Sequence, residues 1–201
     1  MARLTTTPND LPQAVGVPED ERSRLLALAR VAIAVAVGAK PPQALEAALL
    51  DGPLPERAAA AFVTLTEDGE LRGCMGSLDA HSPAWASVTD AARWAARGDP
   101  RFPGVDAGEL PAIEIDVSIL GPLVPLQDPR AFRPGTDGIV VERGRRRAIL
   151  LPEVADTVGH GATRMLDACC AKAGLPPDAW RDPRTELWVF RTRRFGGPAA
   201  G

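Results

Sequence analysis

The pattern of hydrophobic and polar positions predicts helices in the first fifty residues. Residues 19–38, EDERSRLLALARVAIAVAVG, begin with acidic side chains and end at a glycine, which is typical of a helix. Their second half also alternates valine or isoleucine with alanine, as a strand does, but the continuous apolar run favours the helix. Residues 41–53 predict a shorter helix ending near Gly52. Residues 1–17 are interrupted by prolines and predict an extended or flexible arm.

A β-hairpin is predicted in residues 60–78, where hydrophobic runs flank Asp68-Gly69. A two-residue loop fixes the facing pairs as Glu67 with Glu70, Leu65 with Arg72, and Val63 with Cys74. Because side chains alternate along a strand, Arg72 and Cys74 then project from one face.

The remaining elements alternate between helix and strand patterns. Residues 82–98 predict a helix with Ser82 as N-cap, Pro83 at its first position and Gly98 as its stop. Further along we expect a strand at 112–120, a hairpin at 138–152 turning near Gly144, helical segments in 152–180 broken around 159–161, a strand at 185–195, and a flexible tail at 196–201. This mixture predicts an α+β fold with antiparallel or mixed sheets flanked by helices.

Composition fits an ordinary globular protein of 201 residues, 45% hydrophobic and 24% charged. The formal net charge of −3 gives no bulk attraction to nucleic acid or to anionic membranes. The longest apolar run, residues 25–39, contains Arg30 and is shorter than the ~20 residues of a membrane-spanning helix. Three cysteines without CxxC spacing fit a reducing compartment, so we expect a cytoplasmic protein.

The stretch ELRGCMGSL, residues 70–78, is the main candidate for chemistry. A thiol reacts as thiolate, and its pKa of ~8.5 falls when a cation lies close, as Arg72 would on the same strand face. Gly73 and Gly76 permit a bulge or the close approach of a ligand. These features suggest an accessible, activated Cys74. The alternative is that Cys74 is a small buried residue opposite Val63.

Other residues leave alternatives open. The polar face of the strand at 112–120 carries Glu114, Asp116 and Ser118, which line a cleft or simply meet solvent. His81 and His160 have no spacing that ties them to Cys74. Cys169 and Cys170 are expected to pack inside a helix. The arginine-rich segments 142–147 and 191–195 form either a basic patch, with Phe195 as a stacking group, or solubilising surface. No phosphate-loop, dinucleotide or iron–sulfur motif is present, so the cofactor is unknown.

The sequence resembles the AMMECR domain family, called protein A of the AmmeMemoRadiSam system. ELRGCMGSL is similar to the family's LRGCIG strand, with Met75 in place of isoleucine. The blocks DPRFPGVDAGELPAIEIDVSILGPLVPL, DGIVVERGRRRAILLPEVA and CCAKAGLPPDAW follow in the family's order, and together the resemblance extends from about residue 20 to residue 192.

The resemblance implies a two-lobed α+β domain over residues 18–195 with a cleft near the LRGCMG strand. Residues that match the family motifs become site candidates. We expect catalytic roles for Cys74, Arg72 and Glu114, and ligand contacts from Gly73, Gly76, Asp99, Arg101, Phe102 and Asp116. No metal ligand is assigned. The family has no established biochemical activity, so the question of an enzyme stays open.

Three functions are therefore weighed. In the first, a cleft around Cys74 binds a small molecule or carries out thiol chemistry. In the second, the chain is a non-enzymatic subunit for a Memo-like or a radical-SAM protein, the partners that the resemblance implies. In the third, the arginine-rich turn makes the protein a regulatory nucleic-acid binder, against which the net charge argues.

Overall fold

The computed structural model describes residues 16–50 and 52–197, and these fold into two compact units. We call Gly16–Leu120 with residues 193–197 the larger unit, and Gly121–Thr192 the smaller unit. Most of the predicted arm and tail lies outside the described residues. The exceptions are Gly16 and Val17 at the start, and Gly196 and Gly197, which belong to the last strand.

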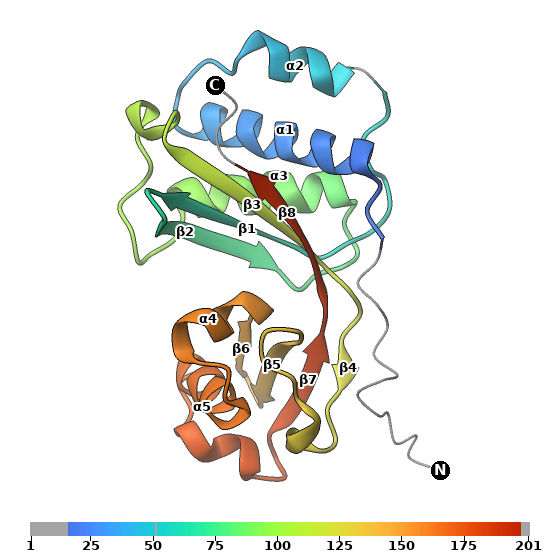
Figure 1. The fold of residues 1–201 in the computed structure, drawn as a ribbon, viewed down its shortest axis with the longest axis vertical. Helices are drawn as coiled ribbons and strands as arrows, with labels where there is room; N and C mark the ends of the chain where they lie inside the picture. The colour runs from blue at the N-terminus through green and yellow to red at the C-terminus, as the bar shows by residue number, and fades with distance from the viewer. Residues whose placement is uncertain (1–15, 51, 198–201) are drawn as a thin grey trace. The chain divides into compact units, whose positions relative to one another are not determined.

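The larger unit is a sheet covered on one face by helices, as predicted for an α+β fold (Figure 1). Its helices are α1 (Glu19–Ala36), α2 (Gln43–Leu50) and α3 (Ala84–Arg97). Its strands are β1 (Ala61–Glu67), β2 (Glu70–Ser77), β3 (Ile113–Leu120) and β8 (Thr192–Gly197), in the order β2-β1-β3-β8. Helix α3 packs on β1 and β2, α1 packs on α3 and β3, and α2 lies over α1.

Alternating side chains of the sheet build the core of the larger unit. Val63 and Leu65 of β1 are fully buried, as is Val117 of β3, while Thr64 between the two β1 residues is only half-buried. Leu25 and Ile33 of α1 complete this core from the helix side, which confirms the helix predicted over residues 19–38. The sheet therefore has an apolar face under the helices and a more polar face opposite, which we call the polar face.

The β1–β2 hairpin forms as predicted, with Asp68 and Gly69 both at positive φ in the turn and Glu67 opposite Glu70. The register beyond the turn differs from the prediction. Thr66 pairs with Leu71 but Leu65 pairs with Gly73, so Arg72 is an extra residue in a β-bulge.

The bulge reverses the faces of the following β2 residues, because a one-residue shift turns each side chain to the other side of the sheet. Cys74 lies opposite Thr64 rather than Val63, and Gly73 rather than Arg72 lies opposite Leu65. The two predicted facing pairs were therefore wrong, and so was the inference that strand alternation alone aligns Arg72 with Cys74. The bulge turns Cys74 out of the core and onto the polar face.

Helix α3 begins one residue later than predicted. Pro83, with ψ of 146°, is the N-cap residue, so Ser82 lies before the helix. Pro18, with ψ of 152°, has the same place in α1. Gly98 ends the helix, as expected. Val88, Ala92 and Ala95 form the buried stripe of α3.

The smaller unit has its own sheet and core. Its strands are β4 (Val124–Pro125), β5 (Gly138–Arg143), β6 (Arg146–Leu150) and β7 (Glu186–Phe190), in the antiparallel order β4-β7-β5-β6. Helices α4 (Ala155–Val158) and α5 (Ala162–Lys172) are separated near Gly159, as predicted, and α5 packs on β5 and β6. The predicted hairpin turning near Gly144 is confirmed.

The strand predicted at 185–195 is divided into β7 and β8, which belong to different sheets. The division falls at Arg191, whose carbonyl oxygen accepts a hydrogen bond from the Gly121 amide at 2.8 Å. Its Nε lies 3.4 Å from Oδ1 of the buried Asp137, and burial is the main cause that raises the pKa of that carboxyl. Among the described residues, no helix is long and apolar enough to cross a lipid bilayer.

Candidate functional site

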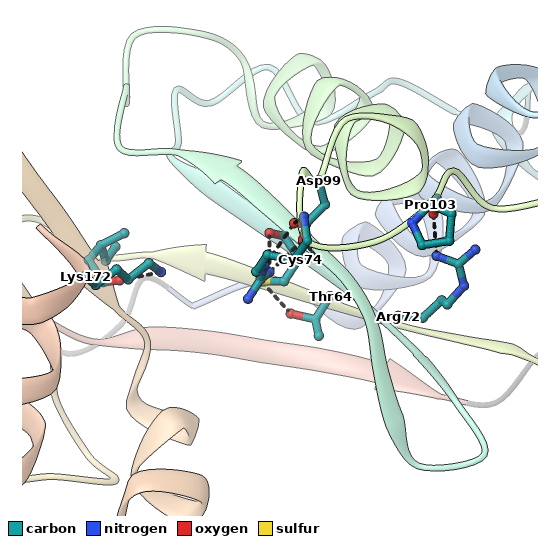
Figure 2. Close-up of polar contacts among 8 residues, drawn as sticks. Thr64, Arg72, Cys74, Asp99, Pro103 and Lys172 are labelled. Carbon is teal, nitrogen blue, oxygen red and sulfur yellow. Dashed lines mark hydrogen bonds and ion pairs between the residues drawn. The ribbon is translucent and has the colours of Figure 1, made fainter. Parts of the chain in front are cut away.

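Cys74 lies on β2, an edge strand of the larger sheet, and its side chain is on the polar face. It is half-buried, and its Sγ accepts a hydrogen bond from the Thr64 hydroxyl of β1 at 3.2 Å (Figure 2). A hydroxyl that donates to sulfur favours the negatively charged thiolate over the neutral thiol. Thr64 was not predicted as a site residue, because only the bulge brings it opposite Cys74.

A second contact holds the main chain at Cys74. The Cys74 amide donates to Oδ2 of Asp99 at 2.9 Å, and Nη2 of Arg101 lies 3.4 Å from the Cys74 carbonyl oxygen. Arg101 also bonds Asp99 through Nε at 2.9 Å and Nη2 at 2.6 Å. This carboxylate–guanidinium pair supplies a donor and an acceptor to the open edge of β2, as a neighbouring strand would. We call Asp99 and Arg101 the edge clamp.

The edge clamp has a clear electrostatic signature. The Asp99 side chain is 2% exposed, and the Arg101 guanidinium lowers its pKa from 3.8 to about 2, helped by the Cys74 amide and opposed by burial. The hydrogen bond to Asp99 raises the pKa of Arg101, and so does the charge that Cys74 carries as a thiolate. Arg101 is therefore a cation close enough to act on Cys74.

Arg72 is engaged elsewhere, as Figure 2 shows for its contact with Pro103. Its guanidinium bonds Glu109 through Nε at 2.7 Å and Nη2 at 3.1 Å, Pro103 O at 2.7 Å and Gly104 O at 3.2 Å. The hydrogen bond from Arg72 lowers the pKa of Glu109, and the Asp106 amide adds to this. Arg72 therefore fastens the loop after α3 to the bulge, and this set of contacts accounts for its charge without the thiol.

Glu109 was missed by the sequence analysis, although a signal was present. Asp106 and Glu109 have the Asp-x-x-Glu spacing of a capping box, and both reciprocal bonds form around the short 3₁₀ helix Ala107–Glu109. The same carboxylate thus caps a helical turn and binds Arg72.

Packing accounts for both glycines beside Cys74. A Cβ on Gly73 would collide with the Ala95 carbonyl oxygen of α3, and one on Gly76 would collide with the Ala61 carbonyl oxygen and the Phe62 ring. Gly73 is buried on the apolar face, so it does not line the polar face with Cys74. Gly73 lets α3 approach β2, and Gly76 makes room for Phe62.

A row of side chains crosses the polar face at Cys74. Thr64 lies opposite Cys74 on one side and opposite Asp116 of β3 on the other, and Asp116 pairs with Arg194 of β8. We call Cys74, Thr64, Asp116 and Arg194 the polar row. Side chains directly opposite in neighbouring strands have Cβ atoms about 5 Å apart, so the row presents a thiol, a hydroxyl and an ion pair together.

Glu114 and Phe102 lie beside this row rather than in it. Glu114 is exposed on β3 opposite Thr66, two residue pairs along the ladder from the polar row. Phe102 follows the edge clamp, and the Arg101 guanidinium lies 5.3 Å from the centre of its ring. Of the acids predicted on β3, the register thus brings Asp116 into the row of Cys74.

The remaining cysteines and the two histidines are not part of the polar row. Cys169 and Cys170 are fully buried in the smaller unit, as expected, and burial raises the pKa of Cys169 to about 12. His160 is exposed and its Nε2 lies 3.0 Å from Asp156, and His81 is an exposed loop residue. Among the described residues, no group of three or more histidines, cysteines and acids is arranged to hold a metal ion.

The arginine-rich segments make internal contacts. Arg143 pairs with Asp182, Arg147 pairs with Glu142, and Arg146 donates to the Gly174 carbonyl oxygen at 2.6 Å. Phe195, considered above as a stacking group, is partly buried against the core of the larger unit. These contacts do not favour nucleic-acid binding.

The fold and site define a two-unit α+β protein with a clamped cysteine on an edge strand. The AMMECR1 family model matches residues 26–195, and the chain belongs to that family. A Methanothermobacter thermautotrophicus protein is 44% identical over 140 residues, which cover 67% of this chain and 73% of the relative. A Nanoarchaeum equitans protein is 40% identical over 144 residues, covering 68% of this chain and 80% of the relative.

A solved structure supports the same fold. The crystal structure of an uncharacterized protein from Pyrococcus horikoshii matches with a TM-score of 0.79 and 32% identity, covering 90% of this chain and 93% of that one. The agreement over nine tenths of both chains confirms the family resemblance and the α+β class.

Proposed function

We propose that the polar row binds a small molecule and that Cys74 is its reactive thiol. The observation that carries this proposal is the hydrogen bond from the Thr64 hydroxyl to Sγ of the half-buried Cys74. A cysteine that only fills space on a sheet needs neither a hydroxyl donor nor a nearby guanidinium.

The surroundings supply what thiol chemistry needs. Arg101 favours the thiolate electrostatically, and the edge clamp fixes the β2 main chain from which the thiol projects. Asp116 and Arg194 add an acceptor and a cation on the same face, suited to orienting a polar ligand. Glu114 is an exposed acid two residue pairs away from Asp116 and remains a predicted participant.

Alkylation of the native protein with iodoacetamide, followed by peptide mass analysis, tests this proposal. We expect Cys74 to react while the fully buried Cys169 and Cys170 do not. Thr64→Val removes the hydroxyl with little change in shape, and we expect it to slow the reaction by about threefold to tenfold, the effect of about one hydrogen bond.

The matched control is Thr66→Val, which makes the same exchange on the same strand face, opposite Leu71. We expect it to leave the rate unchanged. A native Cys74 that does not react, or equal rates in the two variants, would contradict the proposal. Small molecules retained by the wild type but lost from Cys74→Ala, identified by native mass spectrometry, would name the ligand.

A subunit role is the second candidate, and an exposed tryptophan favours it. Trp94 of α3 is 60% exposed, and such side chains are enriched at the centres of interfaces. A Memo-like or a radical-SAM protein of an AmmeMemoRadiSam-type system is the partner that the family suggests. Co-purification should then fail with Trp94→Ala and survive Cys74→Ser, whereas co-purification that survives Trp94→Ala would contradict an interface at this tryptophan.

A further inference from the structure

The helix side of the larger unit contains a hollow of about 630 Å³ that the polar row does not use. Helix α1, the segment after it, α2 and the start of β3 line it. Ile113 and Ile115 form part of its wall from the apolar face of the sheet, opposite the face of Cys74. The hollow is therefore a separate place on the molecule, and its volume lies within the range of small-molecule sites.

The wall of the hollow is mostly hydrocarbon. Ile33 of α1 is 1% exposed, and Leu45 of α2 and Leu110 before β3 are half-buried at its sides. Water in such a space makes few hydrogen bonds to the protein, so an apolar group that displaces it is favoured in proportion to the surface that it covers.

The charges at the hollow have one sign. Arg30 of α1 and Lys40 of the segment after α1 both line it, and none of the described residues lining it carries a carboxylate. Arg30 is half-buried, and burial lowers the pKa of its guanidinium. A cation that is partly withdrawn from water gains more from a nearby anion than an exposed one does.

We infer that this hollow binds a small amphiphilic carboxylate, with its hydrocarbon body against Ile33 and Ile113 and its anionic group near Arg30 and Lys40. The apolar wall selects the body, and the two cations select the charge. This inference goes beyond the proposed thiol function and does not depend on Cys74.

Displacement of the fluorescent probe anilinonaphthalene sulfonate from the full chain tests the inference, with decanoate as the competitor. We expect decanoate to displace the probe, and octanoate to be about tenfold weaker because it buries two fewer methylene groups. Decanol should be weaker than decanoate. Lys40→Gln should weaken decanoate about twofold to fivefold without affecting decanol.

Two substitutions place a larger side chain in the hollow, and a matched control places one on the exposed side of α1. Ala34→Phe and Leu45→Trp add bulk to lining residues and should abolish displacement, while Val35→Phe, at a 61% exposed neighbour on α1, should leave it unchanged. Far-ultraviolet circular dichroism checks folding, and Leu45→Trp keeps the test open should Ala34→Phe unfold.

Three outcomes would overturn the inference. One is the absence of displacement by decanoate, and another is equal binding by Leu45→Trp and wild type. The third is that the protein sediments with phosphatidylglycerol vesicles but does not bind decanoate, which would assign the hollow to membrane lipid.

Discussion

At the scale of single residues, the two arginines predicted as site residues, Arg72 and Arg101, make different contacts. Arg72, two positions from the thiol, bonds Glu109 and two carbonyl oxygens and secures a loop. Arg101, far from Cys74 in sequence, completes the edge clamp and lies close to it in space. The charge relevant to the thiol therefore comes from the loop after α3.

Substitutions of Asp99 and Arg101 can separate two effects on the alkylation rate of Cys74. If charge controls the rate, the two variants change it in opposite directions; if loosening of the edge clamp controls it, they change it in the same direction. We expect Arg101→Gln to slow alkylation of Cys74 by about threefold to tenfold, because a cation that favours the thiolate is lost. Asp99→Asn removes an anion and should accelerate it. Both variants weaken the clamp, so a rate change of the same sign in both would show that loosening, not charge, controls the thiol.

Arg72 is predicted to matter for stability rather than for thiol reactivity. Its side chain is 14% exposed, and Arg72→Gln removes the guanidinium that donates to Glu109 and to two carbonyl oxygens. We expect a loss of about 2 kcal/mol in the free energy of unfolding by urea. Arg93→Gln, at an exposed position of α3, is the control and should stay within about 0.5 kcal/mol.

At the scale of elements, the loop after α3 protects the edge of β2. The edge clamp occupies backbone groups at Cys74, and Arg72 fixes the same loop further along the strand. An open edge strand invites pairing with other chains, and charged groups placed there prevent it. The loop thus positions Cys74 and covers the edge at the same time.

Acid should weaken this element in a defined window. The pKa of Asp99 is lowered from 3.8 to about 2 by Arg101, so its stabilisation is complete above about pH 4 and is lost as the pH falls towards 2. The loss amounts to about 2 kcal/mol at most. Urea unfolding across this range should show it, and Asp99→Asn should remove this part of the pH dependence; an unchanged slope would refute the assignment.

At the scale of the whole molecule, the last strand of the larger sheet comes from the far end of the chain. β8 follows the smaller unit in sequence and pairs beside β3, where Phe195 packs against the core and Arg194 bonds Asp116. Among the described residues, the smaller unit is by contrast one continuous segment, Gly121–Thr192, with its own core. The two units should therefore respond differently to truncation.

Ending the chain after Thr192 removes most of β8. We expect the larger unit to lose about 3 kcal/mol or more, because a row of backbone hydrogen bonds and the Phe195 contact disappear. Hydrogen exchange measured by mass spectrometry should become faster in β1 and β3 and stay unchanged in β5 and β7. Equal acceleration in both sets of strands would show that the units do not unfold separately.

Local patterns were sufficient for most elements. The acidic start and final glycine of residues 19–38 predicted α1, Asp68-Gly69 predicted the hairpin, and strict alternation predicted β3, because these signals depend on neighbours in the sequence. The four motif blocks were sufficient to predict the family to which the chain belongs.

Only the tertiary structure decided which way Cys74 faces and what surrounds it. The bulge at Arg72 accompanies the packing of α3 on Gly73 and the binding of Arg72 by Glu109, all distant in sequence from the turn that sets the hairpin register. The division of the last strand at Arg191 likewise depends on partners at Gly121 and Asp137. Alternation of apolar and polar residues predicts a strand, but contacts with residues distant in sequence determine where the strand bulges and which sheet it joins.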